Sequence, residues 1–189
     1  DASLLDDAKT APKDDAPYAL DLLDPGCSAC MMSFRNQLES NFFESRQVAI
    51  LLYPIQLDDG SYKFANSDLI ARYFYAAALL DQGETSENQK HFDLKLIHKI
   101  FTGKTESGQL IQSYLASLSY DEAKAELKKF LKEFGATDED LKEISQLEKS
   151  DEVKAILAKV KDTTENKIKI TGIPTLIYNG KKHLGLYEN

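Results

Sequence analysis

The stretch Cys27-Ser28-Ala29-Cys30 holds both cysteines of this 189-residue chain. It stands between an apolar run, residues 18–23, and a helical pattern, so we expect the first sulfur to lie at the N-terminus of a helix. Unpaired backbone N–H groups and the helix dipole at that end favour a thiolate over a thiol. A thiolate is the attacking species in disulfide exchange. The spacing therefore predicts redox chemistry, in which Cys30, one helical turn on, attacks a mixed disulfide formed at Cys27.

Two other interpretations of the cysteine pair are weaker. A tetrahedral zinc ion needs about four ligands, and the chain has no second cysteine pair and only three imidazoles, those of His91, His98 and His183. An inert structural disulfide is also disfavoured, because closing so small a loop restrains little of the unfolded chain and contributes little stability. A pair at this spacing makes more sense as a reversible couple.

Asp21 lies inside the apolar run, six residues before Cys27. If the run is a strand, alternation places Asp21 on the same face as Ala19 and Leu23. We expect a carboxylate in that position to be partly buried, to have a raised pKa, and to exchange a proton with the inner thiol of Cys30. The alternative is an aspartate at the edge of a strand, facing water.

A second informative stretch, Gly172-Ile173-Pro174-Thr175-Leu176-Ile177-Tyr178-Asn179-Gly180, lies close to the end of the chain. It predicts a tight turn at a proline, then a short strand, then an Asn-Gly hairpin. Pro174 can also be interpreted simply as the first residue of that strand, where no N–H donor is needed.

The two stretches together resemble a known family. Strand, CxxC, helix and strand, followed later by Gly-Ile-Pro-Thr-Leu and Asn-Gly, are similar to the thioredoxin-like superfamily. The helical segment between the two halves makes the DsbA-like thiol-disulfide oxidoreductases the closer match. The resemblance implies an α/β fold in which residues 17–65 and 166–189 form a thioredoxin-like domain and residues 66–165 form an inserted all-helical domain.

The resemblance also implies a role for each site residue. Cys27 would be the exposed nucleophile, Cys30 the buried resolving thiol, and Asp21 the proton acceptor that activates Cys30. Pro174 would be a cis-proline packed against the disulfide, a rare peptide geometry. Ile173 would offer its backbone N–H and C=O to an extended substrate segment. The Cys27–Cys30 disulfide would be the only redox group, with no other cofactor and no metal.

The chain departs from the DsbA-like pattern between and before the cysteines. Members of that family commonly have Pro-His between the cysteines, whereas this chain has Ser28-Ala29. Without a positive neighbour, and with Asp24 close by, the Cys27 thiolate should be less stabilised than in the strongest oxidants. Asp24-Pro25 is also similar to the disulfide isomerases related to DsbC and DsbG. The helix that normally closes the thioredoxin fold does not follow the last predicted strand.

Helical periodicity runs through residues 66–165 and predicts a lobe of helices on a small sheet. The apolar face that begins at Leu69 should end near Gly83, and a short helix should span residues 110–118. Further helix starts are predicted by polar capping patterns. These are Ser86-x-x-Gln89, Ser119-x-x-Glu122, Thr137 and Ser150.

Composition restricts the location and the partners of the chain. The net charge of −8 argues against nucleic acid, because phosphate binding relies on clustered Lys and Arg. No stretch approaches the roughly 20 apolar residues of a membrane span. Cysteines present only as a couple suit an oxidising compartment. We therefore expect an extracytoplasmic location, the bacterial periplasm or the exterior of the cell envelope, with no signal or anchor in this chain and residues 1–16 as a flexible tail or tether.

The sequence leaves two functions open. The leading hypothesis is a thiol-disulfide oxidoreductase that forms, reduces or isomerises disulfides in extracytoplasmic proteins, with a membrane redox partner that resets the couple. The partners would then be protein substrates with cysteines. The alternative is a non-catalytic module of the same fold that docks peptides or binds Cu(I) through its two thiolates.

Overall fold

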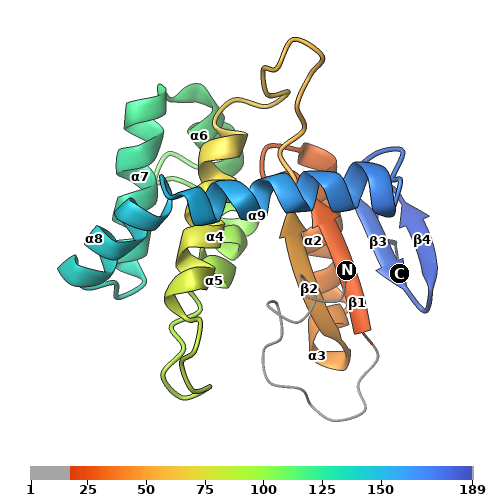
Figure 1. Cartoon of the computed structure of the whole chain (residues 1–189), viewed down its shortest axis with the longest axis horizontal. Helices are drawn as coiled ribbons and strands as arrows, with labels where there is room; N and C mark the ends of the chain where they lie inside the picture. Colours follow the sequence, from red (N-terminus) through yellow and green to blue (C-terminus); the bar gives the residue numbers. More distant parts are fainter. Residues whose placement is uncertain (1–17, 189) are drawn as a thin grey trace.

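The computed structural model describes residues 18–188. A four-stranded sheet lies at one end of the molecule, and a lobe of helices lies at the other (Figure 1). Buried side chains from both parts belong to one continuous core. The predicted tail, residues 1–16, lies outside the described residues.

The sheet has the strand order β2-β1-β3-β4. The central strand β1 (Tyr18–Leu23) runs parallel to β2 (Gln47–Leu52) and antiparallel to β3 (Thr175–Tyr178). A hairpin joins β3 to β4 (Lys181–Leu184). Its two turn residues, Asn179 and Gly180, have φ angles of 51° and 70°, as a two-residue hairpin of this kind requires. The Asn-Gly hairpin was therefore predicted correctly.

Helices cover both faces of the sheet (Figure 1). One face carries α2 (Ser28–Glu39) and the short α3 (Phe42–Ser45). Across the other face runs α9 (Asp151–Asp162), which continues into a π-helical turn, η1 (Thr163–Lys167). Because side chains alternate along β1, Ala19, Asp21 and Leu23 share the face toward α2, as predicted.

The helical lobe comprises the helices between β2 and α9. Its central helix, α4, buries nine of its residues and contacts α5, α7, α8 and α9. None of the helices in residues 18–188 combines the length and apolar character that crossing a membrane requires. The helices of the lobe are α4 (Ser67–Leu80), α5 (Phe92–Thr102), α6 (Ile111–Ser117), α7 (Tyr120–Glu133) and α8 (Asp138–Leu147).

Three of the four predicted caps are present. Ser119 and Thr137 each form a reciprocal capping box, and Ser150 accepts the N–H of Val153. The prediction for Ser86 is wrong. Residues 85–89 form a separate turn, closed by N–H donors to the carbonyl of Thr85, so α5 begins later, after His91. A local capping pattern also suits an isolated turn, and here the turn formed instead.

Candidate redox-active site

Cys27 is the N-cap of α2. Its backbone is extended, with φ −84° and ψ 120°, and its carbonyl accepts the N–H of Met31 at 3.1 Å. Its sulfur accepts the N–H of Cys30 at 3.2 Å. The first sulfur therefore lies at the positive end of the helix, in contact with one of the N–H groups that the helix leaves unpaired.

The two thiols differ sharply in ionisation. A hydrogen bond from the Cys30 side chain, with further help from the N–H groups of Cys30 and Ala29, lowers the pKa of Cys27 to about 7, against opposing burial and the charge of Asp24. Burial raises the pKa of Cys30, which has no exposed surface. Near neutral pH, Cys27 is therefore the sulfur that supplies a thiolate, while Cys30 keeps its proton.

Cys27 is less exposed than the resemblance implied. It was expected to be an exposed nucleophile, but only 7% of its surface is open to solvent. The sulfur turns back onto the N–H of Cys30, and the turn before it is covered by the helical lobe. The neighbouring Ser28 is exposed. Little of Cys27 is therefore open to another sulfur. Cys30 is buried, as expected.

Gln112, on α6, was not identified from the sequence. Its buried carboxamide donates to the carbonyls of Pro25 and Cys27, both at 2.9 Å. One side chain of the helical lobe thus holds two carbonyls of the turn that presents the nucleophile. No sequence signal marks this residue, since a glutamine in a short helix is ordinarily a surface residue.

Asp24 ties the turn to both cysteines through its main chain. Its N–H points to the sulfur of Cys30 at 3.4 Å, and its carbonyl accepts the N–H of Cys27 at 3.1 Å. The turn also passes very close to the segment before α4. A Cβ on Gly26 would lie 2.3 Å from the Cβ of Phe64, so only glycine fits at this position.

The Asp24 side chain is fully buried and accepts three hydrogen bonds. The donors are the N–H of Gly26 at 2.8 Å, the N–H of Ile55 at 2.8 Å and the hydroxyl of Ser67 at 2.5 Å. Gly26 belongs to the same turn, Ile55 to the loop after β2, and Ser67 to the first turn of α4. The carboxylate therefore joins the active-site turn to the helical lobe.

Asp21 is also fully buried, but its surroundings are different. Within the described residues neither carboxylate oxygen has a hydrogen bond of good geometry. Burial raises the pKa of Asp21 to about 7, and the nearby carboxamide of Gln37, itself buried, opposes that rise. The raised pKa agrees with the sequence prediction, and the side chain is more deeply buried than the partial burial predicted for it.

Pro174 and Ile173 lie at the same end of the sheet as the cysteines. The register pairs Leu22 with Thr175, so β1 runs out into the cysteine turn where β3 begins. The Ile173–Pro174 peptide bond is cis, and the carbonyl of Pro174 accepts the N–H of Gly185 at 2.9 Å. Antiparallel pairing thus brings together two motifs that are about 150 residues apart in the sequence.

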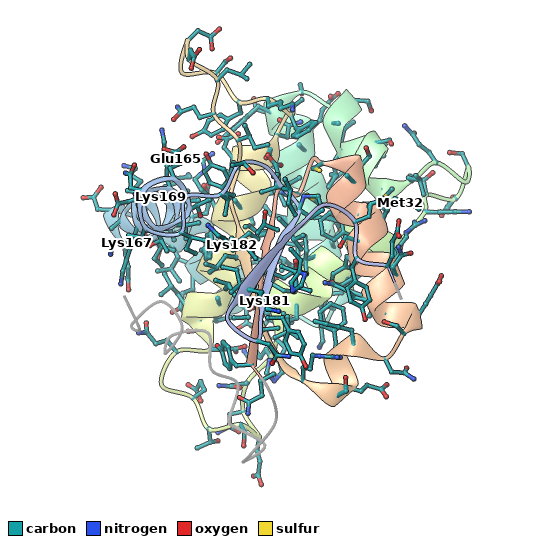
Figure 2. All side chains as sticks on the ribbon, turned by 90° about the vertical axis from the view of Figure 1, so that its right-hand side faces the viewer. Met32, Glu165, Lys167, Lys169, Lys181 and Lys182 are labelled. Carbon is teal, nitrogen blue, oxygen red and sulfur yellow. The ribbon has the colours of Figure 1, made fainter. Side chains whose placement is uncertain are left out.

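Exposed apolar side chains lie near this end of the sheet. Met32, Leu184 and Leu186, here called the apolar rim, are 44%, 59% and 46% exposed. Tyr187 donates its N–H to the hydroxyl of Ser33 at 3.0 Å, which holds the segment after β4 against α2. In Figure 2, Met32 lies on α2, and the exposed lysines of η1 and β4 lie away from it. Met32 is thus apart from these lysines, whereas Leu184 shares β4 with Lys181 and Lys182.

One cluster within residues 18–188 has ligand atoms close enough together to suit a metal ion. Asp81, His91 and Asp93 have ligand atoms within 4.8 Å of one another. The cluster lies in the helical lobe, at the start of α5, and His98 is not part of it. Both oxygens of Asp81 already accept backbone N–H groups, from Lys90 and His91 at 2.8 Å. Those bonds give Asp81 a structural role in holding the loop before α5.

No family model and no curated protein matches the sequence. Solved structures do match. The thiol-disulfide exchange protein alpha-DsbA2 from Wolbachia pipientis is 14% identical, with a TM-score of 0.65 over 99% of this chain and 87% of that chain. MdbA from Corynebacterium diphtheriae, a thiol-disulfide oxidoreductase, is 17% identical, with a TM-score of 0.61 over 92% and 80%. The catalytic domain of Proteus mirabilis ScsC is 16% identical, with a TM-score of 0.57 over 99% and 89%.

The chain has the DsbA-like fold. Its sheet order, the helix that follows the cysteines and the helices between β2 and β3 agree with the predicted thioredoxin-like fold carrying a helical insertion. The fold prediction is confirmed.

Proposed function

We propose that the chain is an extracytoplasmic thiol-disulfide oxidoreductase that acts on cysteines of other proteins. The observation that carries the proposal is the ionisation of the cysteine pair: an N-cap sulfur with a pKa lowered to about 7 lies beside a buried thiol that keeps its proton. Such a pair has one sulfur that attacks and one that resolves. The DsbA-like fold supports the same activity.

In the oxidising direction the chain begins as the Cys27–Cys30 disulfide. A client thiolate attacks the sulfur of Cys27, the Cys27–Cys30 bond breaks, and Cys30 leaves as a thiolate that takes up a proton. A second client thiolate then attacks the client sulfur of the mixed disulfide, and Cys27 leaves as a thiolate. Two electrons pass to the enzyme for each disulfide formed in the client.

In the reducing or isomerising direction Cys27 attacks first. Its thiolate opens a client disulfide, and Cys30 must then lose its proton to attack Cys27 and release the client. We assign that proton to Asp21, because a buried carboxylate with a pKa of about 7 is poised to accept and return a proton near neutral pH. The direction that dominates in the cell depends on the redox potential of the couple.

Client segments would dock beside the sulfur on two features of the site. Ile173 precedes the cis-proline and offers its backbone to an extended chain, a form of strand addition. The apolar rim supplies exposed thioether and leucine side chains, which adapt to many partners. Backbone and apolar contacts of this kind select weakly among sequences, so the range of clients should be broad.

A further partner must reset the couple after each turnover. We propose a membrane redox protein for this role, with the chain acting in the bacterial periplasm or at the exterior of the cell envelope. The support is the DsbA-like fold together with the presence of cysteines only as a couple.

Turnover by matched cysteine variants tests the proposal. Wild type should equilibrate with glutathione as a two-electron couple and should either reduce insulin or oxidise reduced ribonuclease. Cys27→Ser should do neither, whereas Cys30→Ser should accumulate a mixed disulfide. If wild type binds unfolded clients or Cu(I) stoichiometrically without any exchange, the chain is the docking or copper-binding module and the proposal is wrong.

A further inference from the structure

We propose that Asp24 is a positioning residue of the cysteine couple, whose buried negative charge disfavours the Cys27 thiolate and so shifts the couple toward the disulfide. The inference rests on the proposed function, because it concerns how the same couple is adjusted. The sequence predicts only that Asp24 lies close to Cys27 and makes its thiolate less stable. The structure adds which groups hold the Asp24 carboxylate beside the cysteine turn.

The hydrogen bonds at Asp24 favour its charged form and oppose the burial that raises its pKa. Two of its three donors are backbone N–H groups, those of Gly26 and Ile55, which cannot accept a proton from a neutral acid. The third is the hydroxyl of Ser67. A carboxylate that accepts several short hydrogen bonds is favoured in its charged form. The charge is thus held in place by donors from three separate segments.

The main chain of Asp24 lies against both cysteines. The Asp24 N–H contacts the sulfur of Cys30, and the Asp24 carbonyl receives the N–H of Cys27, so the residue is adjacent to the whole pair. Its charge raises the pKa of Cys27 and also that of Cys30. A thiolate that is harder to form makes the dithiol state less stable relative to the disulfide.

Burial and neighbouring groups act on the pKa of Asp24 in opposite directions. Burial raises the pKa of Asp24, whereas the bonds from Ile55, Ser67 and Gly26 and the charge of Lys63 lower it. The charge of Asp24 also helps raise the pKa of Tyr53, the residue after β2, whose hydroxyl donates to Glu165. Lys63 is exposed, so solvent screens it more strongly than it screens the buried pair of Asp24 and Cys27.

Ser67 links the Asp24 carboxylate to the helical lobe. Its hydroxyl reaches Asp24 from the first turn of α4, the central helix of the lobe. Asp21 has no comparable link, since its oxygens lack hydrogen-bond partners within the described residues. The two buried acids therefore have different tasks: Asp24 holds a fixed charge, and Asp21 exchanges a proton.

The test measures the pKa of Cys27 by thiolate absorbance and the equilibrium of the couple with glutathione. Asp24→Asn should lower the pKa of Cys27 enough to raise its acid dissociation constant about 3- to 10-fold, and should shift the glutathione equilibrium toward the dithiol by a similar factor. The pH profile of alkylation at Cys27 should move to lower pH by the same amount. Asp24→Ser also removes the charge but keeps an acceptor for the N–H of Gly26, and it should lower the pKa of Cys27 as well. It replaces Asp24→Asn in the test if the asparagine variant folds poorly.

Two control variants separate charge from packing. Ser67→Ala removes a hydrogen bond but keeps the carboxylate, so the pKa of Cys27 should stay close to the wild-type value. Asp58→Asn removes a charge from the exposed loop after β2 and should have no effect. The proposal is overturned if Ser67→Ala moves the pKa as far as Asp24→Asn does, or if neither neutral variant at position 24 lowers it. Thiolate absorbance needs no turnover, so a chain without oxidoreductase activity would still report on Asp24.

Discussion

Asp21 and Asp24 are two buried carboxylates separated by only two residues, but the hydrogen bonding around them differs. Both have no exposed surface. Asp24 accepts three hydrogen bonds, whereas the oxygens of Asp21 have no partner of good geometry in the part of the chain that the structure describes. Burial raises the pKa of both acids, but at Asp24 the hydrogen bonds oppose that rise far more than anything does at Asp21.

The difference follows from where each residue sits. Asp21 is in the middle of the central strand, where the backbone N–H groups of β1 are used in pairing with β2 and β3. Asp24 is in the turn after that strand, where unpaired N–H groups are available and a short carboxylate reaches them readily. The strand thus leaves its buried acid without hydrogen-bond donors, and the turn supplies its buried acid with three.

The largest expected effect comes from removing Cys27, the nucleophile of the cysteine couple on which both acids are proposed to act. Cys27→Ser should abolish disulfide exchange, because no other thiolate forms readily near neutral pH. Neither Asp21→Asn nor Asp24→Asn should then change the residual rate, measured by insulin reduction. An additional loss from either aspartate variant in the Cys27→Ser background would show that the acid acts independently of the couple.

The second prediction concerns the free energy of unfolding: Asp21→Asn should increase it at pH 8, whereas Asp24→Asn should decrease it at pH 7. The folded-state pKa of Asp21 is raised from 3.8 to about 7, so the folded state binds more protons than the unfolded state between those values. Stability from this group is complete below pH 4 and is lost as the pH rises through 7, by about 4 kcal/mol in total. Asp21→Asn should remove that loss and be more stable than wild type at pH 8, as measured by urea unfolding of the reduced protein.

The matched control for Asp21 is Asp58→Asn, an exposed position where the same chemical change should leave the pH dependence as in wild type. The prediction is wrong if the difference in stability between wild type and Asp21→Asn does not change from pH 4 to pH 8.

Asp24→Asn should destabilise the folded protein, the opposite of Asp21→Asn, and by a smaller amount. The asparagine amide cannot accept from both the N–H of Gly26 and that of Ile55 while its own N–H groups face one of them. We therefore expect a loss of about 2 kcal/mol at pH 7 from the unsatisfied buried donor. Urea unfolding measures it, with Asp58→Asn again as the control. A stabilising effect would mean that the buried charge costs more than its hydrogen bonds return.

The smallest predicted effect lies in the helical lobe. Gln112→Met keeps the size of the side chain but leaves the carbonyl of Pro25 without its donor, which should cost about 1 kcal/mol. Gln109→Met, at an exposed position nearby, should cost nothing measurable in the same unfolding experiment. An equal loss in both variants would show that the effect does not come from the hydrogen bonds that Gln112 donates to the turn.

Much of the fold followed from short-range patterns. The apolar run at residues 18–23, the Asn-Gly turn and the caps at Ser119, Thr137 and Ser150 all form as predicted. These features depend on alternation and on side chains that bond their own backbone, which neighbouring residues alone decide. The cap predicted at Ser86 is wrong because its local pattern suits an isolated turn as well as a helix start.

The site was only partly predictable. Local sequence placed Cys27 at a helix start and Asp21 on a buried face. It did not reveal Gln112 or Ser67, which reach the cysteine turn from helices about 85 and 40 residues away along the chain. Nor did it show how far the turn is covered, which leaves Cys27 with 7% exposure.

By itself, the sequence determined which groups do the chemistry: two thiols one helical turn apart, an acid within an apolar strand, and a proline at the start of another strand. Only the tertiary structure decided how each group ionises. Charge depends on the donors and the solvent around an atom, and those come from segments that the chain brings together only when it folds. The same aspartate side chain therefore has almost no hydrogen bonds at position 21 and three at position 24.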